Sequence, residues 1–201
     1  MSKDQRPQRA GKNLGRPRMR LFVALELPES YLLALSVWRA SIYGELREFR
    51  LPDLQNMHVT LVFLGYQAER DAERIAELCF DSPPGVFELR PTGVGGLPQA
   101  RPRLHALELE DAAGVLGAWQ SEMSQRFATA KLYKPEKRPF RPHVTLARAR
   151  RGRECEAAAA PLPALPARLG KSFRASNAVL FRSTLLRSGA VYEPVATLEL
   201  K

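Results

Sequence analysis

The amino-acid sequence predicts an α+β fold with two pseudo-symmetric lobes, each a small antiparallel sheet flanked by helices, and a cleft between the lobes. Two observations predict this fold. Short segments with the apolar or alternating pattern of strands are mixed with segments that have the apolar stripe of a helix. The string His-Val-Thr-Leu also occurs twice, at residues 58–61 and 143–146, which indicates two related halves.

The first half alternates strands and helices. Its strands are short and apolar or alternating, its helices have apolar residues at helical spacing, and glycine or proline follows most of them. In chain order we expect a strand at 20–27, a helix at 28–47, a strand at 57–64, a helix at 69–80, and a strand pair at 86–94 and 104–109. The inward stripe expected for the first helix is Leu32, Leu35, Val37, Trp38 and Ile42.

The second half repeats this order. Asp111 is placed to cap a helix that runs to about residue 130. The inward stripe expected for that helix is Leu116, Trp119, Met123 and Phe127. The remaining segments are a basic loop at 131–141, a strand at 143–149, an irregular Ala/Pro-rich stretch at 151–170, and strands at 172–181 and 192–200.

Length and charge predict one domain preceded by a tail. The 201 residues suit a single domain, and the 45% that are hydrophobic can form a core. The formal net charge is +10, and residues 1–20 hold seven basic residues but one acidic residue. We therefore expect a basic, disordered N-terminal tail at 1–19 and a single domain at 20–201. A charge of this sign favours polyanionic partners.

The sequence has no obvious signal for a membrane or for secretion. No apolar run approaches the roughly 20 residues of a membrane-spanning helix, and the N-terminus lacks the apolar core of a secretory signal. We expect a cytoplasmic monomer that does not bind membranes. The cysteines, Cys79 and Cys155, have neither metal-ligand spacing nor a disulfide pattern.

The repeated string places the same two side chains on two strands. His58 and Thr60, like His143 and Thr145, are two residues apart, so each pair faces one side of its strand while Val and Leu face the core. Two such strands across a cleft bring two imidazoles and two hydroxyls together. A neutral imidazole can accept a proton and a protonated one can donate it, while hydroxyls bind phosphate oxygens. The pattern therefore indicates phosphodiester chemistry.

Packing and metal binding are the alternative interpretations of these histidines. One His-x-Thr in a strand would be typical of packing, but two copies in a chain with three histidines favour a function. A catalytic zinc ion needs three protein ligands, and the remaining histidine, His105, has the pattern of an ordinary strand residue. We expect neither a metal ion nor a cofactor.

Longer segments around both strings resemble a known family. Residues 57–65 (Met-His-Val-Thr-Leu-Val-Phe-Leu-Gly) and 141–148 (Arg-Pro-His-Val-Thr-Leu-Ala-Arg) resemble the two signature motifs of the 2H phosphoesterase superfamily. Within it, the sequence is similar to the RNA 2′,3′-cyclic phosphodiesterase family, also called 2′-5′ RNA ligase. The likeness extends to the opening strand at 20–24 and to the ending at 183–192, and so covers about residues 19–200.

The resemblance implies an activity and roles for four residues. The activity is metal-independent hydrolysis of a terminal 2′,3′-cyclic phosphate to a 2′-phosphate, with reverse joining of RNA ends through a 2′-5′ bond. By analogy, His58 is the proton donor to the leaving 3′ oxygen, His143 is the proton acceptor that activates water, and Thr60 and Thr145 hold the phosphate. The donor and acceptor exchange in the reverse direction. The implied partner is RNA with a cyclic phosphate end, for example a tRNA fragment, or a cyclic nucleotide.

Further basic residues are weaker candidates. Arg148 is a candidate phosphate ligand, although strict strand alternation puts it on the face opposite His143 unless a bulge or twist intervenes. The basic loop mixes arginines with aromatic rings, so Arg138, Phe140 and Arg141 are candidates for an RNA-binding rim, with a place in the core as the alternative for Phe140. Other arginines could extend such a rim: Arg101, Arg103, Arg150, Arg151 and Arg153.

Two other functions stay open at this point. The same chemistry could act on a small cyclic nucleotide or an ADP-ribose cyclic phosphate, and the rate would then depend little on salt because few phosphates are contacted. A non-catalytic RNA-binding module of the same fold is the other alternative. Such a module would be expected to have lost a motif histidine or threonine, and this chain keeps all four.

Overall fold

The computed structural model describes residues 17–187 and 189–200. The strands are β1 (Arg18–Glu26), β2 (Phe49–Arg50), β3 (His58–Ala68), β4 (Glu88–Leu97), β5 (Leu104–Glu110), β6 (His143–Ala149), β7 (Phe173–Arg174), β8 (Asn177–Leu185) and β9 (Ala190–Glu199). The α-helices are α1 (Glu29–Tyr43), α2 (Ala72–Phe80), α3 (Val115–Thr129) and α4 (Glu154–Ala159). Three 3-10 turns complete the set: η1 (Leu54–Asn56), η2 (Glu69–Asp71) and η3 (Ala167–Leu169).

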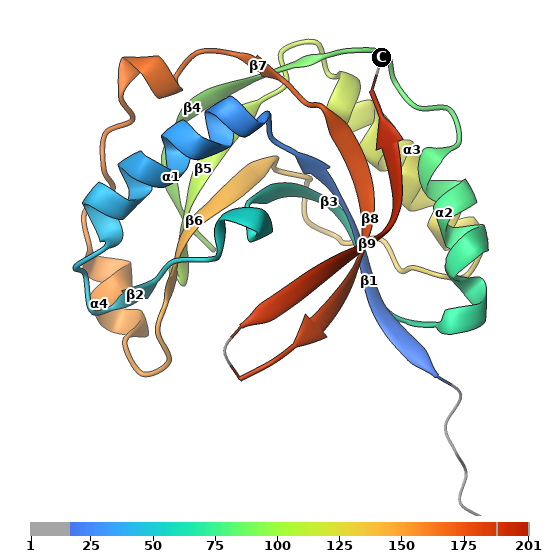
Figure 1. Cartoon of the computed structure of the whole chain (residues 1–201), viewed down its shortest axis with the longest axis horizontal. Coiled ribbons are helices and arrows are strands. Elements are labelled where there is room, and N and C mark those ends of the chain that lie inside the picture. Colours follow the sequence, from blue (N-terminus) through green and yellow to red (C-terminus); the bar gives the residue numbers. More distant parts are fainter. Residues whose placement is uncertain (1–16, 188, 201) are drawn as a thin grey trace, which may run out of the picture.

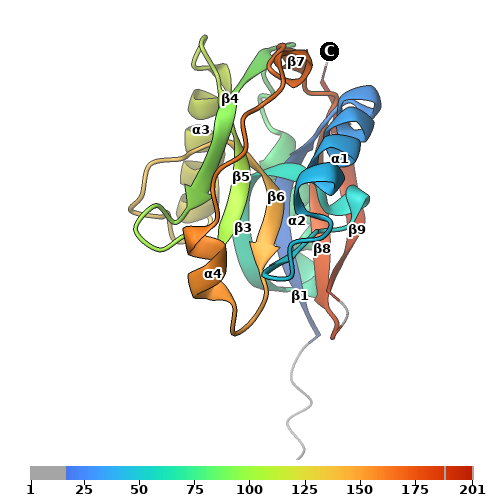
Figure 2. The same ribbon diagram turned by 90° about the vertical axis from the view of Figure 1, so that its left-hand side faces the viewer.

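The strands form a curled antiparallel sheet. Its order is β7-β4-β5-β6-β3-β1-β8-β9, and the short β2 pairs with β6. Figure 1 shows α1 on one side of the molecule and α2 with α3 on the other. The view of Figure 2 again separates α1 from α3. This arrangement confirms the predicted α+β class.

The two motif strands lie side by side in the middle of the sheet. β3 and β6 pair through Val59 and Val144, with β1 and β8 beyond β3 and with β5 and β4 beyond β6. We expected a separate sheet in each lobe, and the structure instead joins both halves in one strand order. The valines that the alternation predicts as core residues are buried at this junction.

Each half contributes a helix to the other. α1 follows β1 in the chain but packs against β6, and α3 follows β5 but packs against β3 and α2. Neither half can therefore cover its own sheet with its own helix alone. The sequence pattern cannot predict this exchange. An apolar stripe shows which face of a helix is buried, but it does not show which strand that face packs against.

Both motif strands contain a bulge at the same position. Where β3 pairs with β1, Leu61 has no partner residue in β1. Where β6 pairs with β5, Leu146 likewise has no partner residue in β5. Each leucine and the residue after it are buried, so the alternation of faces reverses there. As a result Phe63 and Arg148, five residues after each histidine, lie on the exposed side of their strands.

The structure agrees with the predicted type of most segments, helix or strand, but less well with their first and last residues. Asp111 accepts hydrogen bonds from the backbone N–H groups of Leu116 and Gly117 at 2.6 and 3.1 Å, as expected for a residue that caps α3. The whole predicted stripe of α3 is buried. In α1, however, Val37 and Ile42 are exposed, because the helix turns Arg39 and Tyr43 inward instead.

Several sequence-based boundaries differ from the structure; the first helix, for example, ends at Tyr43 and β3 continues to Ala68. The stretch expected to be irregular at 151–170 contains α4, whose Ala157 is buried, and η3. The strand predicted at 172–181 is divided into β7 and β8. Of the tail predicted at 1–19, residues 1–16 lie outside the described residues, and β1 begins at Arg18.

The third histidine belongs to the core. His105 is buried, and its Nδ1 lies 3.0 Å from the hydroxyl of Tyr43. The ring of Phe49 is 4.8 Å away. These contacts support the expectation that His105 is a strand residue with a packing role.

Along the described parts of the chain, 17–187 and 189–200, no helix has both the length and the apolar character needed to cross a membrane.

Candidate active site

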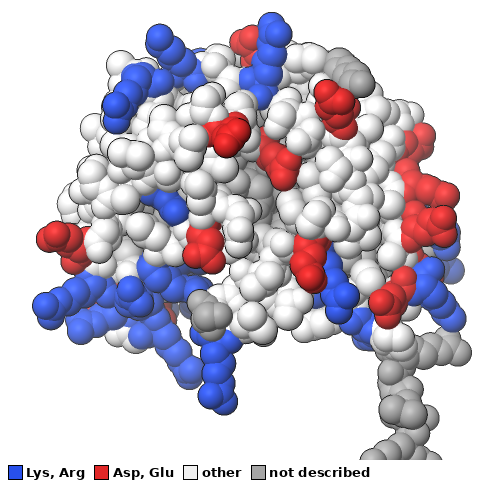
Figure 3. All heavy atoms as spheres, viewed as in Figure 1, with Lys and Arg blue, Asp and Glu red and all other residues white. Residues whose placement is uncertain are grey.

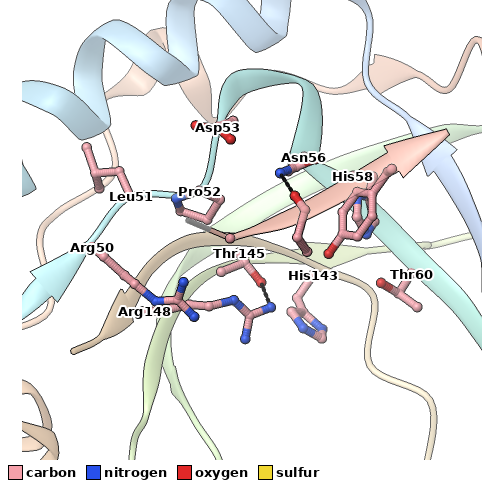
Figure 4. A pocket seen from close by; sticks show the side chains of 13 residues that line it. Arg50, Leu51, Pro52, Asp53, Asn56, His58, Thr60, His143, Thr145 and Arg148 are labelled. Carbon is pink, nitrogen blue, oxygen red and sulfur yellow. Dashed lines mark hydrogen bonds between the residues drawn. The ribbon is translucent and has the colours of Figure 1, made fainter. Parts of the chain in front are cut away.

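A pocket of about 160 Å³ opens where the two motif strands meet. Its walls come from β2 and the segment after it, from η1, from the beginnings of β3 and β6, and from the β8–β9 hairpin. All four motif side chains line it: His58, Thr60, His143 and Thr145. Figure 4 shows these side chains around one space, with Arg50 and Arg148 at one end of it.

The hydrogen bond of His143 fixes its tautomer. Its Nδ1 lies 2.8 Å from the backbone carbonyl oxygen of Arg141. A carbonyl oxygen can only accept, so Nδ1 carries the hydrogen and Nε2 keeps a lone pair when the ring is neutral. His143 is therefore oriented as a proton acceptor.

The side chain of Arg141 in turn holds the carbonyl that orients His143. Its guanidinium pairs with the Glu108 carboxylate at 2.6 Å, and Glu108 is the cross-strand partner of His143 in β5. The carboxylate can lie there because residue 95 is a glycine. A Cβ atom at Gly95 would be only 2.6 Å from the Glu108 Oε1 atom and would clash with it. Arg141 thus acts on His143 through the backbone and does not line the pocket.

His58 has a different environment. Its ring packs among the aromatic rings of Phe22, Phe181 and Tyr192, with centroid distances of 5.0, 6.1 and 5.5 Å. Its Nδ1 is buried and has no hydrogen-bond partner. Burial, and then the positive charges of Arg148 and His143, lower the pKa of His58 to about 4. In the free protein His58 is therefore neutral near pH 7.

Arg148 reaches the pocket because of the bulge at Leu146. It donates a hydrogen bond to the Thr145 Oγ1 atom at 3.3 Å, and strict alternation, which puts it on the opposite face, does not hold here. Arg50 lies directly across from it in the β2–β6 pair. Desolvation lowers the pKa of Arg148, the Tyr192 hydroxyl raises it, and the charge of Arg50 lowers it further.

A buried arginine ties two walls of the pocket together. Arg39 of α1 donates to the carbonyl oxygen of Pro52 at 2.6 Å and to that of Leu146 at 3.3 Å. Pro52 lies in the pocket wall and Leu146 is the bulged residue of β6. Its pKa is lowered by burial, an effect that the carboxylate of Asp53 opposes.

The predicted RNA-binding rim is not part of the pocket wall. Arg138 is paired with Glu136 at 3.5 Å, and Phe140 packs against the core, as its alternative interpretation proposed. The structure instead adds Arg50, Asn56 and Tyr192 to the wall. Asn56 donates to the Ala190 carbonyl at 2.9 Å and so joins η1 to the hairpin. Only Tyr192 had a sequence signal, as part of the family-like ending.

In the described part of the chain, no three or more His, Cys, Asp or Glu side chains lie together so that they could hold a metal ion.

Comparisons with known proteins agree on one family. The family model described as the 2′-5′ RNA ligase superfamily matches residues 35–184. The RNA 2′,3′-cyclic phosphodiesterase of Aeropyrum pernix is 33% identical over 151 residues, which cover 69% of this chain and 79% of that protein. The protein of the same name from Thermus thermophilus is 30% identical over 203 residues, 91% of each chain.

Solved structures show the same fold. TT0787 of Thermus thermophilus superposes with a TM-score of 0.75 at 25% identity, covering 90% of this chain and 98% of that one. LigT of E. coli, crystallised with 3′-AMP, superposes with a TM-score of 0.74 at 22% identity, covering 92% and 99%.

Proposed function

The chain belongs to the 2′-5′ RNA ligase superfamily, and on this basis we propose that it hydrolyses 2′,3′-cyclic phosphate ends of RNA to 2′-phosphates. The observation that carries the proposal is the convergence of both His-x-Thr pairs and two arginines on one pocket. Two of its relatives bear the name RNA 2′,3′-cyclic phosphodiesterase. Its single domain would extend over residues 20–201 and act as a monomer.

In this mechanism His143 is the base. Its free Nε2 takes a proton from a water molecule, whose oxygen bonds to phosphorus as the bond to the 3′ oxygen breaks. The leaving 3′ oxygen takes the proton of His58. In the reverse direction the same groups exchange roles and re-form the cyclic phosphate with release of water. Joining of two RNA ends through a 2′-5′ bond would use the 5′ hydroxyl of the second RNA in place of water, with His143 as its base and His58 as the donor to the 3′ oxygen.

The phosphate would lie between the threonines and Arg148. Because Arg148 donates to the Thr145 oxygen, the hydroxyl hydrogen of Thr145 is left to donate to a non-bridging phosphate oxygen. Thr60 can donate from the opposite strand. Hydrogen bonds to these oxygens stabilise the charge that they carry in the transition state.

Protonation of His58 would accompany substrate binding. A proton donor must be protonated, yet His58 is neutral near pH 7 in the free protein because of its lowered pKa. A bound cyclic phosphate brings a negative charge next to His58 and offsets the charges of Arg148 and His143. The bound substrate would thus raise the pKa of His58, the group that donates a proton to it.

The test uses an oligoribonucleotide that ends in a 2′,3′-cyclic phosphate, incubated with and without EDTA. We expect a 2′-phosphate product in both cases, and replacement of His58 or His143 by alanine should lower kcat by at least about 10²-fold. A 3′-phosphate product, or loss of activity with the chelator, would contradict the mechanism. Glu110→Gln is a suitable control, since Glu110 pairs with Arg90 and does not line the pocket.

A further inference from the structure

Five arginines gather at the end of the sheet that adjoins the pocket. We call Arg50, Arg103, Arg148, Arg150 and Arg151 the arginine face; all five are exposed. Figure 3 shows basic side chains clustered on this lower left side of the molecule, over the ends of β2 and β6. The face is continuous with the pocket, because Arg50 and Arg148 line the pocket as well.

Backbone pairing brings these residues together. Arg50 and Arg148 are opposite each other in the β2–β6 pair, and the carbonyl of Arg103 accepts a 2.8 Å hydrogen bond from Ala149. Arg150 donates its N–H to the Glu48 carbonyl at 2.8 Å, and Arg151 follows in the turn. Three neighbouring segments of the chain therefore present arginines at one edge.

The charges of the arginine face are not neutralised within the protein. Among residues 17–187 and 189–200, none of its five side chains forms an ion pair. Like charges directly opposite each other on paired strands are destabilising. An arrangement of this kind is stabilised by an anion that binds across it.

The arginine face is wider than one phosphate group. Neighbouring strands lie about 4.8 Å apart, so the segments of Arg50, Arg148 and Arg103 span about 10 Å across the sheet. A nucleoside 2′,3′-cyclic phosphate carries a single negative charge, which the motif threonines and Arg148 already accommodate. The remaining arginines of the face are therefore left to bind further phosphates.

The basic loop before the second motif is a poorer RNA-binding surface than sequence reasoning suggested. Its two arginines in the predicted rim both have acidic partners: Arg138 pairs with Glu136 and Arg141 with Glu108. An RNA phosphate would have to compete with these carboxylates. Among the described residues, no carboxylate pairs with an arginine of the arginine face, so none would compete there with an RNA phosphate.

We propose that the arginine face binds the phosphodiester backbone of the RNA strand that leads to the cyclic phosphate end. The proposal rests on the cyclic phosphodiesterase function and specifies its substrate class, an oligoribonucleotide in preference to a mononucleotide. Its consequence is a strong dependence on salt for oligonucleotides alone, since each phosphate contact releases counterions.

The test is a triple variant, Arg103→Gln with Arg150→Gln and Arg151→Gln, which leaves the pocket arginines in place. The values of kcat/KM are measured on a nucleoside 2′,3′-cyclic phosphate and on a ten-residue oligoribonucleotide with the same end, over a range of salt concentrations. For the oligonucleotide we expect a loss of at least about tenfold at low salt. The slope of log(kcat/KM) against log salt should become shallower by about 2, roughly 0.7 for each contact with a single strand. For the mononucleotide we expect a change within about twofold.

The control removes the same charge elsewhere. Arg74→Gln, Arg168→Gln and Lys171→Gln lie in α2, in η3 and just after it, and all three side chains are exposed. This control variant should keep the oligonucleotide preference and the salt slope. Equal losses in both triple variants would overturn the proposal, because net charge rather than the arginine face would then be responsible.

Two further outcomes separate this proposal from the proposed function. If wild-type protein hydrolyses the mononucleotide but neither prefers the oligonucleotide nor responds to salt, the arginine face does not bind RNA. If wild-type protein hydrolyses neither substrate, the proposed function fails, and fluorescence anisotropy with a labelled oligoribonucleotide still tests the face. Equal binding by wild-type and triple-variant protein would then reject it.

Discussion

His58 and His143 begin identical strings, yet their surroundings prepare them for different tasks. The hydrogen bond to the Arg141 carbonyl holds His143 with a free Nε2, whereas the Nδ1 of His58 has no partner and its ring lies among aromatic side chains. Strand alternation alone cannot distinguish the two. The assignment of acceptor and donor that the family resemblance implies is supported for His143 by this geometry.

The lowered pKa of His58 predicts a difference between two pH profiles. The profile of kcat/KM reports the free protein, where protonated His58 becomes scarce as pH rises above about 4. The profile of kcat reports the complex, where the bound phosphate raises the pKa. We expect the limb of the kcat/KM profile that His58 sets to lie near pH 4 and the corresponding limb of kcat to lie at least about one pH unit higher, measured on a cyclic mononucleotide between about pH 3 and 9.

An arginine variant checks the cause of this difference. Arg148→Gln removes a positive charge next to His58 and should move the limb of kcat/KM that His58 sets to higher pH, because one of the effects that lower the pKa of His58 is gone. Coincident limbs in the wild-type protein would show that bound substrate does not change the protonation of His58.

At the scale of elements, the shape of the pocket depends on how α1 meets β6. Arg39 satisfies the carbonyl of the bulged Leu146 and that of Pro52 in the facing wall. The bulge is also what turns Arg148 toward the pocket. A helix that belongs to one half of the molecule thus positions the motif strand of the other.

Arg39→Met should therefore affect both stability and substrate binding. It removes one hydrogen bond from the buried Leu146 carbonyl and another from the partly buried Pro52 carbonyl, and we expect the free energy of unfolding to fall by about 1–3 kcal/mol. KM should rise by about tenfold with a smaller change in kcat, because Arg39 does not touch the reacting atoms. Urea denaturation and steady-state kinetics measure the two effects. As a control, Arg74→Met changes an exposed arginine and should alter the free energy of unfolding by less than about 0.5 kcal/mol. An equally small change for Arg39→Met would show that Arg39 does not position the pocket.

Local patterns predicted much of this site, and tertiary pairing decided the rest. The alternation rule placed His58, Thr60, His143 and Thr145 on one side of their strands, and all four line the pocket. It failed for Arg148 because a bulge depends on the register with a partner strand, which periodicity does not contain. Arg50 and Asn56 lie in a segment without periodic pattern, so their place could be found only from the fold.

At the scale of the whole molecule, the two related halves are more closely connected than a pair of lobes. They share a sheet through Val59 and Val144, and α1 and α3 each pack on the half to which they do not belong in chain order. The candidate active site lies at this junction. Any loosening of one half against the other would separate the histidines that the mechanism needs together.

This exchange of helices predicts that the halves unfold together. The chain has two tryptophans, Trp38 in α1 and Trp119 in α3, and both are buried. Trp38→Phe leaves Trp119 as the fluorescent probe, and Trp119→Phe leaves Trp38, so each variant reports on one of the exchanged helices. We expect the probe in each variant to change in a single urea transition that coincides with the loss of helical circular dichroism in that same variant. Two independent lobes would give a fluorescence transition separated from the circular dichroism transition in at least one variant, because the remaining tryptophan would follow only its own half. That outcome would show that the junction between β3 and β6 does not couple the halves, and the shared active site would then have to be assembled by substrate.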